Sequence, residues 1–187
     1  MTRPRSSTNA ERIVHVVPTA GGTPREIHRF RHLGSDWITL EFTADGSMVL
    51  MARKNSPPGE ASWTLLGLPV AGGEPRDLGL TSAGFVKVAA HPDGDRIAFT
   101  AFRSDNGDLY LYSFSEGTAT KILSRGGLNT SPAWSPDGGS IALTMSESGN
   151  SDIYMLEVDS GDLQRLTARN SIETSASFSP ARSASFP

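Results

Sequence analysis

Three aspartates in one recurring motif are the residues of this sequence whose type and spacing could do chemistry. Asp45 lies in TADG, Asp93 in HPDG and Asp137 in SPDG. Carboxylates brought together could bind a metal ion or transfer protons. A turn explains the motif better, because aspartate accepts hydrogen bonds from nearby amides, proline presets φ and glycine takes the left-handed conformation. We therefore expect structural turns here.

Two oxygen-rich segments, SDNGD at 104–108 and SGNSD at 148–152, have the composition of a calcium site. Neither has the spacing of a calcium-binding loop, which ends in a bidentate glutamate. Asp108 and Asp152 each stand just before an expected strand, at equivalent positions of a repeat, and this place suits an aspartate that caps a turn. We expect no metal site and no cofactor.

The histidines form no catalytic pattern. His28 and His32 are four residues apart, a spacing that has meaning on a helix, but REIHRFRHLGS reads as a strand that runs into a loop. His15 and His91 occupy repeat positions that other residue types fill elsewhere, which indicates packing. HExxH, Walker, dinucleotide-binding and GxSxG motifs do not occur. We expect no catalytic residues and predict that the protein is not an enzyme.

Composition limits the classes of partner. The 187 residues are 37% hydrophobic and 20% charged, with a formal net charge of −3, so the basic surface that nucleic acid requires is not expected. The absence of cysteine excludes disulfides and thiolate chemistry. No apolar run is long enough for a membrane span or marks a signal peptide. We expect neither nucleic-acid binding nor membrane insertion.

The aspartate motif belongs to an internal repeat. The turn ends at Gly46, Gly94 and Gly138, with a degraded SPAR ending at Arg182. A second marker, a glycine followed by a polar segment and an aliphatic residue, begins at Gly22, Gly73, Gly117 and Gly161. Both markers settle to intervals of 44 residues after a longer first interval. Two markers that keep one period indicate a true repeat.

Each repeat predicts four short strands and no helix. RIAFTAF at 96–102 and SIALTMS at 140–146 alternate large apolar with small residues, so each suits a strand that another sheet approaches closely. LYLYSF and IYMLEV suit strands covered on both faces. A four-stranded repeat of this length is typical of a β-propeller blade. We predict an all-β protein, a β-propeller of four-stranded antiparallel blades, incomplete or closed by pairing of terminal half-blades.

The predicted organisation is a disordered N-terminal segment at 1–11 and one propeller segment at 12–187. The segment divides into a half-blade at 12–30, blades at about 37–78, 86–123 and 131–167, and a half-blade at 174–187. Unpaired edges of half-blades favour association. The two halves could close a small ring or pair with a second chain, or the chain could be a fragment of a longer propeller, as the loss of Asp-Gly at 181–182 suggests.

The stretch SPAWSPDGGSIALTMSESGNSDIYMLEVDSGDLQRLT, followed by IETSASFSP, resembles consecutive blades of the TolB-type β-propeller, the periplasmic component of the Tol-Pal envelope system. GGEPRDLGL and VKVAAHPDGDRIAFTA resemble related repeats of bacterial sensor and regulatory proteins. The resemblance extends from about Arg12 onward and implies a periplasmic location. The sequence as printed shows no signal peptide, no N-terminal α/β domain and fewer blades than that family's six-bladed ring, so the compartment stays open.

Loops that lead from the outermost strand of one blade to the innermost strand of the next gather at one mouth of a propeller. Here they are 79–85, 124–130 and 168–174, and they differ among repeats whose strands agree. In TolB-type propellers, such loops contribute to the surface for the peptidoglycan-associated lipoprotein. The resemblance implies a partner-binding site at the matching residues, which are Leu128, Asn129, Thr130, Ile172, Glu173 and Thr174.

These observations favour a non-enzymatic scaffold that binds a protein or peptide partner, with self-association through the terminal half-blades left open. One alternative is an accessory propeller that gates substrate access in a serine peptidase of the prolyl oligopeptidase or tricorn type. Another is the sensor propeller of a bacterial regulatory protein. The first would need a separate hydrolase domain and the second a DNA-binding or kinase domain.

Overall fold

The structure is a computed structural model that describes residues 11–31, 39–54, 63–82, 84–103, 106–147, 149–168 and 171–179. Within these ranges the chain forms strands and no helix, so the all-β prediction is confirmed. The strands are β1 Glu11–Val16, β2 Arg25–Arg31, β3 Leu40–Phe42, β4 Met48–Lys54, β5 Trp63–Pro69, β6 Arg76–Ser82, β7 Phe85–Ala90, β8 Arg96–Arg103, β9 Asn106–Ser113, β10 Thr118–Leu123, β11 Asn129–Trp134, β12 Ser140–Met145, β13 Asp152–Glu157 and β14 Leu163–Arg165.

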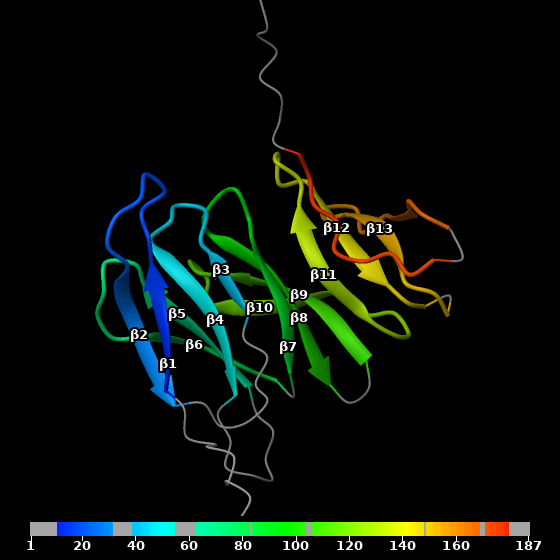
Figure 1. Ribbon diagram of the computed structural model, residues 1–187. Helices are drawn as coiled ribbons and strands as arrows, with labels where there is room; N and C mark the ends of the chain where they lie inside the picture. The colour runs from blue at the N-terminus through cyan, green and yellow to red at the C-terminus, as the bar shows by residue number, and fades with distance from the viewer. Residues whose placement is uncertain are drawn as a thin grey trace, which may run out of the picture. The chain divides into compact units, whose positions relative to one another are not determined.

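These strands make one two-stranded and three four-stranded sheets, in which every neighbouring pair whose register is resolved is antiparallel (Figure 1). Each four-stranded sheet follows the chain order, so every blade is a simple meander of consecutive strands. The chain divides into two units, residues 1–81 and 82–187.

In the first unit, the β1–β2 pair packs on the sheet β3–β4–β5–β6. Val14, Ile27 and Phe30 from the pair form one hydrophobic cluster with residues of β4 and β5. The cluster members from the larger sheet are Val49, Met51 and Leu68, and they are 4% exposed or less. Along β2, Ile27 and Phe30 are buried, whereas the arginines of this strand are exposed. The two buried residues are three positions apart, so strict alternation would put them on opposite faces, but a register shift between Val14 and His15 leaves Ile27 as an extra residue and interrupts the alternation.

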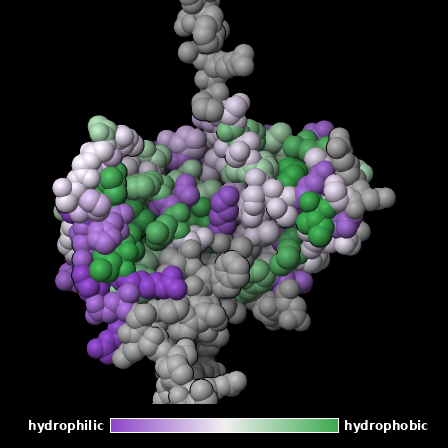
Figure 2. Space-filling model, in the orientation of Figure 1, coloured by the Kyte–Doolittle hydropathy of each residue, from purple (hydrophilic) through white to green (hydrophobic). Residues whose placement is uncertain are grey.

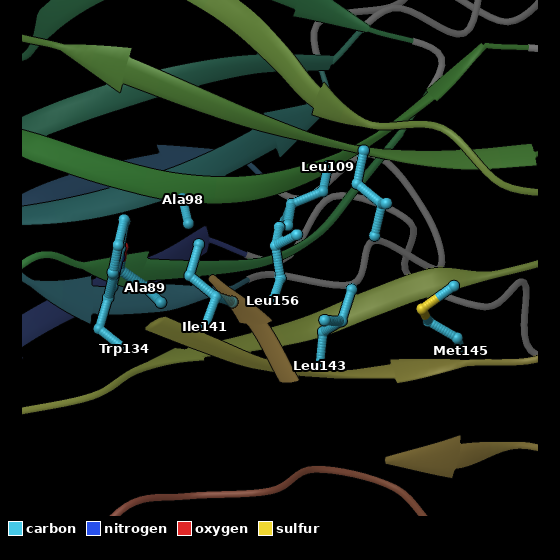
Figure 3. Close-up of a cluster of buried hydrophobic side chains, with 9 residues drawn as sticks. Ala89, Ala98, Leu109, Trp134, Ile141, Leu143, Met145 and Leu156 are labelled. Atoms are coloured by element: carbon cyan, nitrogen blue, oxygen red, sulfur yellow. The ribbon is translucent and has the colours of Figure 1, made fainter. Parts of the chain in front are cut away.

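In the second unit, the sheet of β7 to β10 packs on the sheet of β11 to β14. The small residues Ala89 and Ala98 lie against Trp134 and Ile141 at one end of the shared core, and Met145 lies at the other end (Figure 3). This arrangement confirms that the small face of β8 lets another sheet approach closely. Trp134 also donates a hydrogen bond from Nε1 to the carbonyl of Ala89 at 3.2 Å, which joins the two sheets.

The surface carries scattered apolar residues. On the face that Figure 2 shows, hydrophobic residues are interspersed with hydrophilic ones. The large hydrophobic side chains exposed in the described residues are Ile13, Val17, Leu40, Phe42, Leu128, Leu166 and Ile172. Single exposed apolar residues are normal on a protein surface, so exposure alone does not mark any of these residues as part of a binding site.

The prediction of a strand over TSASFSP, residues 174–180, is wrong for the part that the structure describes, because residues 171–179 form no strand. A strand needs a ladder of hydrogen bonds, and no second strand pairs with this segment within the described residues. Two separate bonds hold it instead: Glu173 N donates to Ser151 O at 2.8 Å and Ser175 N donates to Thr144 Oγ1 at 3.1 Å. Residues 180–187, the rest of the expected half-blade, lie outside the described residues.

The described strands do not close a ring. The sheet of β1 and β2 has two strands, and no strand from the later part of the chain joins it. Of the two predicted forms of the propeller, the incomplete one therefore describes these strands. Residues 1–10 of the expected disordered segment lie outside the described residues, whereas Glu11 is the first residue of β1.

Candidate partner-binding site

The six residues predicted to contact a partner form two segments, Leu128–Thr130 and Ile172–Thr174, which we call the candidate segments. They stand 44 positions apart, one repeat length. Each begins with an exposed apolar side chain: Leu128 is 41% and Ile172 is 77% exposed. Both segments belong to the second unit, and Leu128 of the first and Ser175, directly after the second, form hydrogen bonds to residues near the end of β12.

The two segments converge on the end of β12. Thr130 lies opposite Thr144 in the β11–β12 ladder, and the Oγ1 atom of Thr144 accepts a hydrogen bond from Ser175 N at 3.1 Å. Leu128 exchanges bonds with Ser146, donating from N to Oγ at 2.9 Å and accepting at O from N at 3.0 Å. Thr144 and Ser146 thus hold the first segment, and Thr144 also holds Ser175, the residue that follows the second segment.

Asn129 is a buried anchor, which the sequence did not reveal. The residue is 0% exposed, and its Nδ2 atom donates to Gly107 O at 2.7 Å and to Arg125 O at 2.9 Å. Its own carbonyl accepts a bond from Thr100 Oγ1 at 2.9 Å. A side chain enclosed in this way cannot touch a partner directly, so Asn129 positions the first segment against β8 and β9.

Glu173 occupies the equivalent position of the next repeat and is anchored differently. Its backbone N donates to Ser151 O at 2.8 Å, and Ser151 is the repeat equivalent of Gly107. The same junction is therefore made by a side-chain amide at Asn129 and by a backbone amide at Glu173. Because the backbone does the anchoring, the Glu173 carboxylate is left for other contacts.

Backbone strain and unsatisfied polar atoms gather at the same place. Ser131 and Ser175, which directly follow the candidate segments, have φ of 54° and 60°, and in the described residues every other positive φ belongs to glycine. Buried oxygens without a hydrogen-bond partner among the described residues include Asn129 Oδ1, Thr130 Oγ1 and Glu173 Oε2. Strain and unmet hydrogen bonds of this kind cluster at functional sites. The repeated NTS and ETS triplets were the sequence signal for it.

The turn aspartates are structural, as predicted. Asp45 Oδ1 accepts bonds from Thr43 Oγ1 at 2.6 Å and from Ser47 N at 3.0 Å, and these bonds lower the pKa of Asp45 to about 2. Asp137 accepts the same pair of bonds, from the hydroxyl of Ser135 and the amide of Gly139, and its pKa is lowered. Each carboxylate is occupied by its own turn.

The third turn is built around His91, which is 4% exposed. Burial opposes ionisation of Asp93, but the bond from Arg96 Nε at 2.8 Å and backbone amides outweigh it and lower the pKa of Asp93 to about 2. The His91 ring meets the Trp134 ring edge-on, with centroids 4.3 Å apart, and its Nε2 lies 3.1 Å from Gly138 O. His91 is a packing residue at the joint between two blades.

His28 is also held by packing. Its ring stacks on Phe30 at a centroid distance of 5.7 Å, and burial, followed by the charge of Arg53, lowers its pKa. His32 lies outside the described residues. Among the described residues no cluster of three histidine, aspartate or glutamate side chains is arranged to hold a metal ion.

Asp108 and Asp152 pair with cations on the neighbouring strand. Asp152, 0% exposed, accepts a bond from Arg165 Nη2 at 2.6 Å, and Asp108 lies 3.4 Å from Lys121 Nζ. Both pairs occupy equivalent repeat positions and join the third strand of a blade to the fourth. The carboxylates of Asp108 and Asp152, which suggested a calcium site, therefore form ion pairs within the blades.

The meander sheets define a partial β-propeller. Residues 71–185, more than half of the chain, match the TolB beta propeller domain. The chain belongs to this family. A comparison with curated proteins finds no match.

Solved structures support the same fold. TolB from Acinetobacter baumannii has a TM-score of 0.73 and 20% identity, over 89% of this chain and 40% of that chain. A TolB-type protein from Agrobacterium tumefaciens has a TM-score of 0.70 and 22% identity, over 87% of this chain and 57% of that chain. A mutant puromycin hydrolase has a TM-score of 0.62 and 18% identity, over 84% of this chain and 25% of that chain.

Identities at this level establish the fold alone. The chain spans 40% and 57% of the two TolB chains it resembles. The fold is therefore shared both with TolB proteins and with a hydrolase. None of the described residues forms a helix with the length and apolar character needed to span a bilayer.

Proposed function

We propose that this chain is a non-enzymatic scaffold that binds a protein or peptide partner through the candidate segments. The observation that carries the proposal is the convergence of two repeat-equivalent segments, each with an exposed apolar residue, on the end of β12. Hydrogen bonds to Ser146 and Ser151 hold the two segments, and a preorganised surface loses little conformational entropy on binding. The residues assigned to direct contact are Leu128, Thr130, Ile172, Glu173 and Thr174, with Asn129 as their support.

Membership of the TolB propeller family supports this assignment, because the corresponding loops of TolB-type propellers contribute to a partner surface. By that resemblance the partner class includes an envelope protein such as the peptidoglycan-associated lipoprotein. The described turn aspartates and His91 are engaged in turns and packing, which supports the non-enzymatic part of the proposal.

Peptides selected from a random display library by the wild-type chain provide a direct test. The double variant Leu128→Ser and Ile172→Ser removes both apolar contacts, and we expect the dissociation constants of the selected peptides to rise about tenfold or more. Leu166→Ser is the matched control, because Leu166 is 46% exposed in the same unit but lies outside both segments. Selected peptides that bind the double variant as tightly as the wild type would refute the assignment.

A gating propeller of a serine peptidase is the second candidate, favoured by the similarity to puromycin hydrolase. It makes a different genetic prediction: the gene would encode a GxSxG-containing hydrolase domain beyond the printed sequence. A neighbourhood of envelope genes without such a domain would favour the scaffold.

A further inference from the structure

The two candidate segments differ in one chemical respect that bears on the partner. This inference rests on the proposed function and concerns which partner the same surface takes. At position 129 the side-chain amide makes the junction with Gly107, whereas at position 173 the backbone makes the junction with Ser151. Blade geometry therefore fixes the side chain of Asn129 and leaves that of Glu173 unassigned.

The surroundings of Glu173 do not neutralise it. Its side chain is half-buried, and its carboxylate forms no ion pair within the described residues. The charged residue near the other segment, Arg125, faces Glu147 at 3.8 Å, so that pair balances itself. One carboxylate thus remains at the site without a counter-charge among the described residues.

The unsatisfied atoms at the site are hydrogen-bond acceptors or can act as acceptors. Glu173 Oε2 and Asn129 Oδ1 only accept, and Thr130 Oγ1 can do so. Asn129 is wholly buried and cannot touch a partner, so the unmet acceptor that a ligand would satisfy is that of the half-buried Glu173. A buried acceptor left unmet destabilises the structure, and a donor brought by a ligand removes that penalty.

The two segments are bonded to residues on either side of the β12–β13 turn. Leu128 is bonded to Ser146 and Glu173 to Ser151, and these residues flank the β12–β13 turn, whose strands pair at Met145 and Asp152. An apolar side chain at one end and a carboxylate at the other form an amphipathic surface. A single carboxylate without further oxygen ligands is a poor metal site, but it suits a cationic side chain.

We propose that the site selects peptides that present a lysine or arginine side chain to Glu173, next to an apolar side chain that contacts Leu128 or Ile172. The cation supplies the counter-charge and the donors, and the apolar neighbour covers the exposed leucine or isoleucine. A charge-assisted bond of this kind gives specificity as well as affinity.

Peptide selection tests the partner class. We expect peptides recovered from a random display library by the wild-type chain to be enriched in lysine or arginine at one position. Replacing that residue of the peptide by alanine should weaken binding about tenfold or more, as expected for a charged hydrogen bond. The Glu173→Gln variant should bind the same peptide severalfold more weakly than the wild type does, and the Glu173→Lys variant should show no preference for peptides with lysine or arginine.

A charge exchange makes the test specific. The selected peptide with its cation replaced by glutamate should bind Glu173→Lys better than it binds the wild type. Glu116→Lys, the same charge change on an exposed turn of the same unit, is the control and should leave affinity within about twofold. Circular dichroism and the unfolding midpoint would confirm that each variant is folded.

The outcomes separate this inference from the proposed function. Peptides that depend on Leu128 and Ile172 but show no preference for lysine or arginine would overturn the inference and leave the scaffold function standing. Equal binding to wild type and Glu173→Gln would do the same. Failure to recover any peptide, or binding unaffected by the double variant at Leu128 and Ile172, would overturn both.

Discussion

Ser131 and Ser175 take the same left-handed backbone conformation at equivalent positions of two successive repeats, with φ of 54° and 60°. A residue with a side chain is strained there by about 1–2 kcal/mol. Each serine directly follows a candidate segment, and Ser175 is fixed by its bond to Thr144. The bend is therefore a repeated feature of how a blade begins, imposed even where no strand follows.

Replacing Ser131 by glycine should stabilise the protein. Glycine adopts this φ without strain, and this gain exceeds its larger entropy loss, so we expect the free energy of unfolding to rise by about 0.5–1 kcal/mol. Urea denaturation measures the change. Ala119→Gly, at an exposed position of β10, is the control and should lower the same quantity by about 0.5–1 kcal/mol. A fall for Ser131→Gly similar to the control would show that the bend is unstrained.

The anchoring role of Asn129 predicts an asymmetry between equivalent positions. Asn129→Asp removes both amide donors and places a carboxylate beside the carbonyls of Gly107 and Arg125, so the free energy of unfolding should fall by about 2–4 kcal/mol. Glu173→Ala keeps the backbone bond to Ser151 and should change stability by about 0.5 kcal/mol or less. Chemical denaturation of both variants checks this. Equal losses would mean that the two junctions are held in the same way.

The repeat made most of the fold predictable, because two markers in phase locate two turns of each blade and thereby the strands on either side of them. The turn aspartates were predictable for the same reason, since their bonds are local: Asp45 reaches Thr43 and Ser47. Local chemistry can be read from adjacent residues.

Asn129 and the segment at 174–179 were not predictable, because their structure depends on distant residues. Burial of Asn129 is decided by the carbonyl of Gly107, which comes from another strand. The segment at 174–179 has a strand-like sequence, but a strand requires a partner, and none pairs with it in the described part of the chain. In the same way, the sequence showed acidic segments at Asp108 and Asp152 but not the cations across the sheet that occupy them.

The turn carboxylates predict a dependence of stability on acid. The pKa of Asp45 is about 2 in the folded protein, below its ordinary value of 3.8, because Thr43 and Ser47 bind the ionised form. Between pH about 4 and about 2, Asp45 is therefore protonated to a greater extent in the unfolded chain than in the folded protein. The stabilisation that its ionised form gives the folded protein is present above this pH range and is lost as the pH falls through it. Asp45→Asn cannot titrate, and its urea midpoint should fall less across the window than that of wild type. Parallel curves would contradict the assignment.

The joint between two blades predicts that one turn glycine is far less replaceable than another. Gly94 and Gly138 close equivalent turns with φ of 79° and 75°, so alanine is strained by about 1 kcal/mol at either position. A Cβ at Gly94 would meet nothing within 4 Å, whereas a Cβ at Gly138 would lie 2.3 Å from Nε2 of His91. Gly138→Ala must displace a buried ring that packs on Trp134, so we expect it to lower the free energy of unfolding by about 3 kcal/mol.

A second substitution isolates the clash from the backbone strain. His91→Ser introduces the residue found at the equivalent position 135 and opens space for the new methyl group. In the double variant, Gly138→Ala should then cost only about 1 kcal/mol relative to His91→Ser, the value expected for Gly94→Ala in the wild type. Urea denaturation of the wild type, the two single variants and the double variant gives the coupling energy between positions 91 and 138. A coupling near zero would mean that His91 does not set the shape of the Gly138 turn.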